Sequence, residues 1–384
     1  MKKKLIGFVL SAVLAVSVFA GCGSAGGDGD TIKIGTLGPY SGDNAMYGEG
    51  AKNGMELAVE EINNNGGIDG KKIELVSYDT KGDATEAVNA YSRLRDQDGV
   101  VAVVGPVLSG EALAIKDMAK EDNMPILTPT GTANDITIDA PNSFRVCYLD
   151  AYQGNAAANF AVGTADKELG AKTAAILVNK GNAYSEGLAA AFTKTFEAKG
   201  GKVVGTESYA QNDKDFSAQL TKIQALNPEV IYIPDYYNVA GPILKKAKEM
   251  GINAKFVGGD GWDSVQVEYA DAAQGTYFAN HYAADSPDEK VQNFIKAYSE
   301  KFDKTANSFA GLGYDAIYCM TDAIKAAGGT DAQAIIDALG KTDFTGVTGH
   351  FTFDENGDPK GKEITIITVD GGELKFVTTV QGDN

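Results

Sequence analysis

Hydroxyl side chains and one acid follow predicted strands in a pattern suited to binding two opposite charges. A strand over residues 100–104 leads into a loop with Ser109, and the next strand leads into a loop with Thr130 and Thr132. Hydroxyl and N–H groups at a helix N-terminus favour anions, so these residues would suit one carboxylate. A later strand end carries Asp260 between glycines, where it would face an ammonium. The pattern predicts a receptor site for a small zwitterion that closes when both ends are held.

Each of these residues also has a purely structural alternative. Ser109 would serve as the N-cap of a helix that starts at Gly110, which is the simpler interpretation when the residue is taken alone. Thr130 and Thr132 would be turn residues, and Asp260 would cap a short helix. A hydrolase built on Ser109 is a distant alternative, because neither of the two histidines, His281 and His350, falls in a predicted cleft loop with it.

The elements that must position these residues alternate between β-rich apolar runs and amphipathic helical stretches. This order predicts an α/β fold with two doubly wound parallel-sheet lobes and an antiparallel tail, whose turn lies at residues 354–358. Ligands of open α/β sheets bind beyond the carboxyl ends of the strands, where the hydroxyls and Asp260 are expected. Strands are predicted at 32–37, 73–78, 100–104, 125–128, 173–178, 203–209, 230–233 and 255–257, and helices at 84–96, 111–121, 288–302, 308–327 and 332–339.

The first thirty residues predict where the chain works. Lys2–Lys4 precede an apolar run, residues 5–19, that is too short for a stable membrane span, so residues 1–21 read as an export signal. Phe19-Ala20-Gly21-Cys22 resembles the lipobox of bacterial lipoproteins, with Phe19 in place of the usual leucine. Cleavage there would leave Cys22 lipidated at the start of a flexible tether, residues 22–30, and would anchor the protein to the cell membrane on its extracytoplasmic face. The alternative is ordinary cleavage near Ala20.

Composition excludes several function classes. The formal net charge of −18, with 52 acidic against 34 basic residues, argues against nucleic acid and anionic lipid as partners. The chain offers no phosphate-binding Gly-Lys-Ser/Thr loop and no complete calcium loop, so we expect no cofactor and no metal. Cys147 and Cys319 allow at most one disulfide, and we expect two buried free thiols. The absence of a catalytic set favours a binding protein over an enzyme.

Segments along the whole mature chain resemble the periplasmic leucine/isoleucine/valine-binding proteins, the type I substrate-binding components of ABC amino-acid importers. The resemblance lies in their order and spacing as much as in their identity. The segments include Ile32-Lys33-Ile34-Gly35, Tyr40-Ser41-Gly42, Tyr47-Gly48, Asn65-Gly66-Gly67-Ile68-Asp69-Gly70, Gly105 with Ser109, Thr128-Pro129-Thr130 with Thr132, Tyr184-Ser185-Glu186-Gly187, Lys214-Asp215-Phe216-Ser217 and Phe353-Asp354.

The resemblance implies a role for each site residue. The ligand carboxylate would be held by Ser109, Thr130 and Thr132, and the amino group by Asp260, where relatives have glutamate. Tyr236 would join the amino-group shell. The pocket for the ligand side chain would be formed by Tyr47, Tyr184, Trp262 and Phe309.

It also implies an architecture and partners. Three crossovers near Val146, Ala279 and Phe351 would divide the chain into lobe 1 (31–147 and 279–350) and lobe 2 (148–278 and 351–384), with hinge bending between them. The expected function is capture of an α-amino acid, a branched-chain one by the resemblance, by a monomer that delivers it to a membrane permease driven by a separate ATPase. The alternatives are a ligand sensor of the same fold, or a receptor for amides, urea or aromatic acids.

Overall fold

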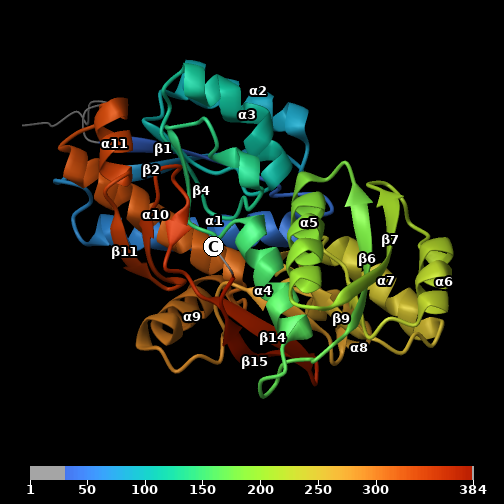
Figure 1. Cartoon of the computed structure of the whole chain (residues 1–384). Coiled ribbons are helices and arrows are strands. Elements are labelled where there is room, and N and C mark those ends of the chain that lie inside the picture. The colour runs from blue at the N-terminus through green and yellow to red at the C-terminus, as the bar shows by residue number, and fades with distance from the viewer. Residues whose placement is uncertain (1–30, 383–384) are drawn as a thin grey trace, which may run out of the picture.

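The computed structural model describes residues 31–382, so the predicted signal peptide, Cys22 and the whole tether lie outside the described residues. Two open sheets form the cores of two lobes, which lie to the left and right in Figure 1. The strand order of the first sheet is β2-β1-β3-β4-β5, and all of its strands are parallel. The second has the order β15-β14-β10-β9-β8-β6-β7. The predicted α/β class with two doubly wound lobes is confirmed.

The first lobe is built from strand, loop and helix units followed by a later helical block. Its strands are β1 (Thr31–Gly38), β2 (Lys72–Asp79), β3 (Ala102–Val104), β4 (Ile126–Thr128) and β5 (Ser143–Arg145). Its helices are α1 (Ala45–Asn64), α2 (Ala84–Arg93), α3 (Ser109–Glu121), α9 (Glu289–Phe302), α10 (Ser308–Ala327) and α11 (Ala332–Leu339), with a π-helical turn at Leu94–Asp98 and a 3-10 turn at Asn134–Ile136.

The second lobe repeats the parallel winding and adds two antiparallel strands. Its strands are β6 (Thr173–Lys180), β7 (Lys202–Ala210), β8 (Val230–Tyr232), β9 (Lys255–Gly258), β10 (Tyr277–Asn280), β14 (Ile364–Asp370) and β15 (Glu373–Val380). Its helices are α4 (Asp150–Val162), α5 (Ala183–Ala198), α6 (Ser217–Leu226), α7 (Tyr237–Glu249) and α8 (Val265–Ala273), with a 3-10 turn at Asp260–Trp262. The β14 strand pairs antiparallel with both β10 and β15, which confirms the antiparallel tail.

Three connections join the lobes. The first runs from β5 to α4 and the second from β10 to α9. The third follows a small antiparallel sheet of β11 (Asp343–Gly346), β12 (Gly349–Phe353) and β13 (Pro359–Lys360). Phe351 lies within β12, and the chain enters the seven-stranded sheet again at Ile364, after β13 ends at Lys360. The division into lobes at residues 147, 278 and 350 stays a prediction.

Close helix packing holds the first lobe together. α1 and α10 lie side by side, and Gly54 and Gly313 allow the contact: an added Cβ would lie 2.0 Å from the carbonyl oxygen of Ala310 and 2.3 Å from that of Ala51, respectively. Two apolar helices can approach this closely only where side chains are missing. The α1–α10 pair thus forms a rigid base from which the N-terminal ends of both helices reach toward the second lobe.

Further predictions are settled by the described residues. Cys147 and Cys319 are buried free thiols, as expected. The turn predicted at residues 354–358 joins β12 to β13, where Asp354 N–H donates to the Asp358 carbonyl at 2.9 Å. Within residues 31–382, no helix combines the length and the apolar character that a membrane crossing requires.

Candidate ligand-binding site

A small, narrow cavity lies where loops from both lobes meet. Most of its walls follow the carboxyl ends of β3, β4, β6, β8 and β9, the edge at which open α/β sheets bind ligands. Two wider grooves beside α10 and β11 lie on one lobe and lack this convergence of loops. The cavity is lined by Val107, Leu108, Ser109, Thr130, Thr132, Tyr184, Tyr236, Asp260, Gly261 and Phe309.

The hydroxyl edge of the cavity is built by two loops of the first lobe. The Ser109 Oγ accepts hydrogen bonds from the N–H groups of Thr132, at 3.2 Å, and Ala133, at 3.1 Å. The Thr130 hydroxyl donates to the Val107 carbonyl at 2.5 Å. Because Ser109 uses its oxygen as an acceptor, its O–H hydrogen remains to donate to an anion in the cavity.

The expectation that Ser109 caps the helix is wrong. Ser109 is the first helical residue of α3, and Leu108 holds the cap position. The Glu111 carboxylate accepts the Leu108 N–H at 3.3 Å, which satisfies a donor that the helix leaves unpaired. Burial raises the pKa of Glu111 to about 7. The Ser109 side chain is thereby released from capping and ties the two hydroxyl loops together.

The acidic edge is formed by Asp260 with three donors around its carboxylate. Oδ1 accepts from the Tyr184 hydroxyl at 2.8 Å and from Gln153 Nε2 at 3.1 Å. Oδ2 lies 3.0 Å from His281 Nε2. The Asp260 N–H donates in turn to Gln153 Oε1 at 2.7 Å, so side chain and backbone are both fixed. Hydrogen bonding of this kind allows a carboxylate to be buried with its charge, and Asp260 is 2% exposed.

Two further buried acids lie close to this edge, and the sequence pattern singled out neither. Asp150, the first residue of α4, has a pKa raised well above its ordinary value by burial, with the charge of Asp260 adding to the effect. These effects favour the protonated form of Asp150. Asp235 accepts from the Tyr209 hydroxyl at 2.5 Å and from the Tyr236 N–H at 2.7 Å, and it fixes the loop that carries Tyr236.

An aromatic cluster closes the remaining side of the cavity. Tyr47 stacks on Phe309 with ring centroids 4.3 Å apart, and its ring edge meets Tyr236 at 5.7 Å and Tyr237 at 5.1 Å. Tyr236 in turn stacks on Tyr184 at 5.0 Å. Tyr236, Tyr184 and Phe309 line the cavity, whereas Tyr47 supports them from behind. These rings offer an apolar surface to the uncharged part of a ligand.

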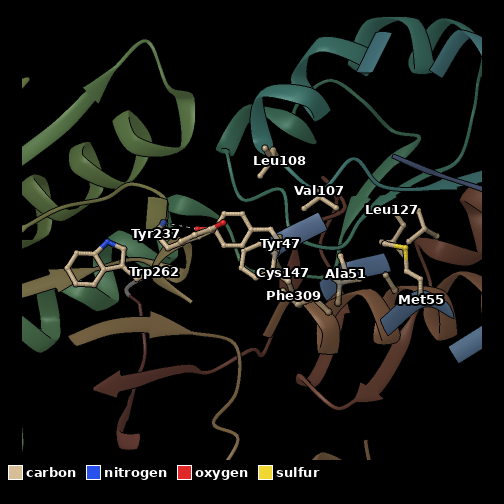
Figure 2. Packing of buried hydrophobic residues seen from close by; sticks show 14 of the residues in the cluster. Tyr47, Ala51, Met55, Val107, Leu108, Leu127, Cys147, Tyr237, Trp262 and Phe309 are labelled. Carbon is tan, nitrogen blue, oxygen red and sulfur yellow. Dashed lines mark hydrogen bonds between the residues drawn. The ribbon is translucent and has the colours of Figure 1, made fainter. Parts of the chain in front are cut away.

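Hydrogen bonds cross from one lobe to the other beside the cavity. The Tyr47 hydroxyl donates to the Gly261 carbonyl and accepts the Tyr237 N–H at 2.9 Å, as Figure 2 shows for the second bond. Asp263 Oδ2 accepts the N–H of Ser308, at the start of α10, at 2.6 Å. These bonds join elements of different lobes, so the described arrangement is a closed one.

Trp262 does not join the cavity. Its indole is fully buried in the second lobe, donates to the Ile233 carbonyl at 2.9 Å and packs near Phe278. Figure 2 shows the ring directed away from Tyr47 and Phe309. Trp262 is therefore left out of the proposed pocket.

Gln153, His281 and Asp150 are the site residues that sequence reasoning missed. No motif marks them, because each becomes a partner of the site only through the packing of α4 and the second interlobe connection against the β9 loop. The only available signal was chemical: a buried acid in a cleft requires donors.

Two lobes, a cleft at the carboxyl ends of parallel strands, and opposed hydroxyl and acidic edges define a two-lobed binding protein of the type I periplasmic class. The chain matches the model described as "Periplasmic binding protein" over residues 31–373 and belongs to that family.

Three similar proteins differ in the ligands that they are named for or bind. The chain is 33% identical to the leucine-, isoleucine-, valine-, threonine- and alanine-binding protein of Pseudomonas aeruginosa over 93% of this chain and 95% of that one. It resembles the branched-chain amino acid transporter substrate-binding protein LivJ of Streptococcus pneumoniae in complex with isoleucine, with TM-score 0.85, 33% identity, and coverage of 91% and 99%. It also resembles a solute-binding protein of R. palustris in complex with benzoate, with TM-score 0.84, 26% identity, and coverage of 92% and 98%.

Proposed function

We propose that this protein is an extracytoplasmic receptor that captures an α-amino acid with a branched aliphatic side chain and delivers it to an ABC importer. The ligand carboxylate binds to Ser109, Thr130 and Thr132, and the amino group to Asp260. Tyr236, Tyr184 and Phe309 surround the side chain, and Tyr47 backs them. Relatives that bind branched-chain amino acids support this ligand class.

The observation that carries the proposal is the uncompensated acid. Asp260 lines the cavity, is held by three side-chain donors, and faces a space whose described lining includes no Lys or Arg. A buried carboxylate without a cationic partner favours a ligand that supplies one. The hydroxyl loops at the other edge favour a carboxylate, so a zwitterion satisfies both edges together. An aromatic acid without an amine would leave Asp260 without a cationic partner, which disfavours the benzoate-like alternative.

The energetics are consistent with reversible capture. A hydrogen bond to a charged group contributes about 1.5–3 kcal/mol, and burying an aliphatic side chain contributes a similar amount. Several such contacts, less the costs of association and closure, give a free energy near the roughly −8 kcal/mol of micromolar binding. The residues of the site hold and release a ligand without any covalent step, so we propose a binding role rather than catalysis.

Anchoring and delivery complete the proposal. Cleavage before Cys22 would leave a lipidated cysteine and a tether that keeps the receptor at the membrane next to its permease, which is driven by a separate ATPase. A monomer with two lobes presents one closed form for docking. A sensor of the same fold would use the same closed form to act on a membrane signalling protein. The two roles differ in one outcome: delivery to an importer predicts that ligand uptake by cells depends on this chain.

A binding titration tests the proposal. Isothermal titration of the mature protein with leucine, isoleucine, valine, alanine and benzoate should give micromolar binding for at least one of the three branched amino acids. Asp260→Asn should weaken that binding about 10-fold to 150-fold, since it removes the charge that holds the ammonium. If none of the amino acids binds and benzoate does, the assignment is overturned and Asp260 is a structural residue.

A further inference from the structure

His281 lies against the acid of the site from the second connection between the lobes. It follows β10 directly, its side chain is fully buried, and its Nε2 lies 3.0 Å from Asp260 Oδ2. The imidazole stacks on Tyr148 of the first connection, with centroids 3.9 Å apart and an interplanar angle of 19°. Asp260, which would hold the ligand's amino group, therefore contacts the second connection directly through His281 and the first connection indirectly through Tyr148.

The surroundings of the ring select one protonation state. His281 Nδ1 has no hydrogen-bond partner among the described residues, whereas Nε2 faces the carboxylate. A neutral ring with its proton on Nε2 donates to Asp260 and leaves only a lone pair unpaired, while the other tautomer would bring a lone pair against the carboxylate. Burial lowers the pKa of His281 below its ordinary value of 6.5, and Asp260 opposes this shift only in part.

The charged groups around the ring explain what protonation would change. Asp260 and Asp263 approach the ring from the β9 loop, and their charges favour its protonated form. Lys362 of the third connection carries a positive charge that disfavours the protonated form. Asp260 is thus the anion that a protonated His281 would pair with directly. In the proposed function the same carboxylate binds the ligand's ammonium, so two cations would share one anion at close range.

We propose that His281 is a positioning residue for Asp260: as a neutral imidazole it directs the carboxylate toward the ligand's amino group, and once protonated it competes with that group and weakens binding. The inference rests on the proposed function for the identity of the ligand. The protein then holds its amino acid at neutral pH and releases it more readily in acid.

The first test compares two substitutions across pH, with leucine as the probe. His281→Gln retains a donor within reach of Asp260 but cannot take up a proton, so it should bind leucine within about threefold of the wild type at pH 8 and should lack the acid weakening. His281→Leu removes the donor and should weaken binding about tenfold to a hundredfold at pH 8. His350→Gln is the matched control, because His350 also pairs with an acid, Asp343 at 2.8 Å, but is exposed. An unaltered acid weakening in His281→Gln, or full affinity in His281→Leu, would overturn the proposal.

The second test needs no ligand. The chain contains two histidines, so nitrogen NMR of the imidazoles resolves His281 against His350 as an internal reference. We expect His281 to carry its proton on Nε2 and to titrate at a lower pH in Asp260→Asn, because the carboxylate that stabilises the imidazolium is lost. A proton on Nδ1, or a titration insensitive to Asp260→Asn, refutes the pair itself. If no amino acid binds the wild type while this NMR pattern holds, the proposed ligand is wrong and the pair is real.

Discussion

The hydroxyl of Tyr47 is a single atom on which closure of the two lobes depends. It donates to the Gly261 carbonyl and accepts the Tyr237 N–H, and both partners belong to the opposite lobe. Tyr47→Phe deletes this oxygen and retains the ring, which keeps its stack on Phe309 and its edge contacts. The substitution therefore tests the hydrogen bonds apart from the packing.

The magnitude follows from what the closed form loses. Two hydrogen bonds contribute about 1–3 kcal/mol together, and their partners stay buried in the closed form but reach water when the lobes separate. Closure becomes less favourable by that amount, and the dissociation constant of the ligand rises about 5-fold to 150-fold. Titration calorimetry measures this dissociation constant. Stopped-flow dissociation should show most of the change in the off-rate, since the Tyr47 hydrogen bonds form only after the ligand has bound and the lobes have closed.

The control for this experiment is a tyrosine that bonds within one lobe. Tyr298 of α9 accepts from Asn53 Nδ2 of α1 at 3.3 Å and is almost fully buried, so Tyr298→Phe alters a buried hydroxyl without touching the interlobe contact. It should leave ligand affinity unchanged. An affinity of Tyr47→Phe within twofold of the wild type would refute the reasoning, because it would mean that the hydroxyl contributes nothing to the closed form.

Two further predictions concern stability. Gly54→Ala should lower the free energy of unfolding by about 1–3 kcal/mol, because the new Cβ would lie 2.0 Å from the Ala310 carbonyl oxygen and force α1 from α10; Gly110→Ala, which meets no atom within 4 Å, should be neutral or slightly stabilising in the same urea titration. Burial raises the pKa of Glu111 from 4.5 to about 7, so the folded state holds this proton more tightly than the unfolded state does. The free energy of unfolding should therefore decrease by about 3 kcal/mol at most as pH rises from 4.5 to 7. Glu111→Gln should remove this decrease, and an equal decrease in both proteins would contradict the assignment.

The sequence predicted the fold well because the relevant signals are local. Strand and helix periodicity located both windings, and the glycines and hydroxyls at strand ends marked the loops that line the cavity. The error at Ser109 was also local: Glu111 stands three residues after Leu108, the spacing at which an acidic side chain reaches the cap N–H, so the helix starts one residue earlier than a hydroxyl cap suggests.

The partners of Asp260 follow from a different kind of information. Gln153 precedes Asp260 by 107 residues in sequence, and its contact depends on how α4 packs in the assembled lobe. His281 is closer in sequence but reaches Asp260 only because β10 pairs beside β9. No periodicity records which polar side chain will face a buried acid, so sequence located the acid without the donors that hold it.

The glycines around Asp260 explain why this acid faces the cavity and why the Trp262 indole packs into the core of the second lobe instead. A Cβ at Gly258 would lie 2.2 Å from the Trp262 ring, so this glycine opens the space that takes the indole into the core of the second lobe. A Cβ at Gly259 would lie 2.5 Å from Gln153 Oε1 and 2.7 Å from the Tyr184 hydroxyl, the groups that fix Asp260. The missing side chains admit the donors on one side and the indole on the other, and the acid between them is left to face the cavity.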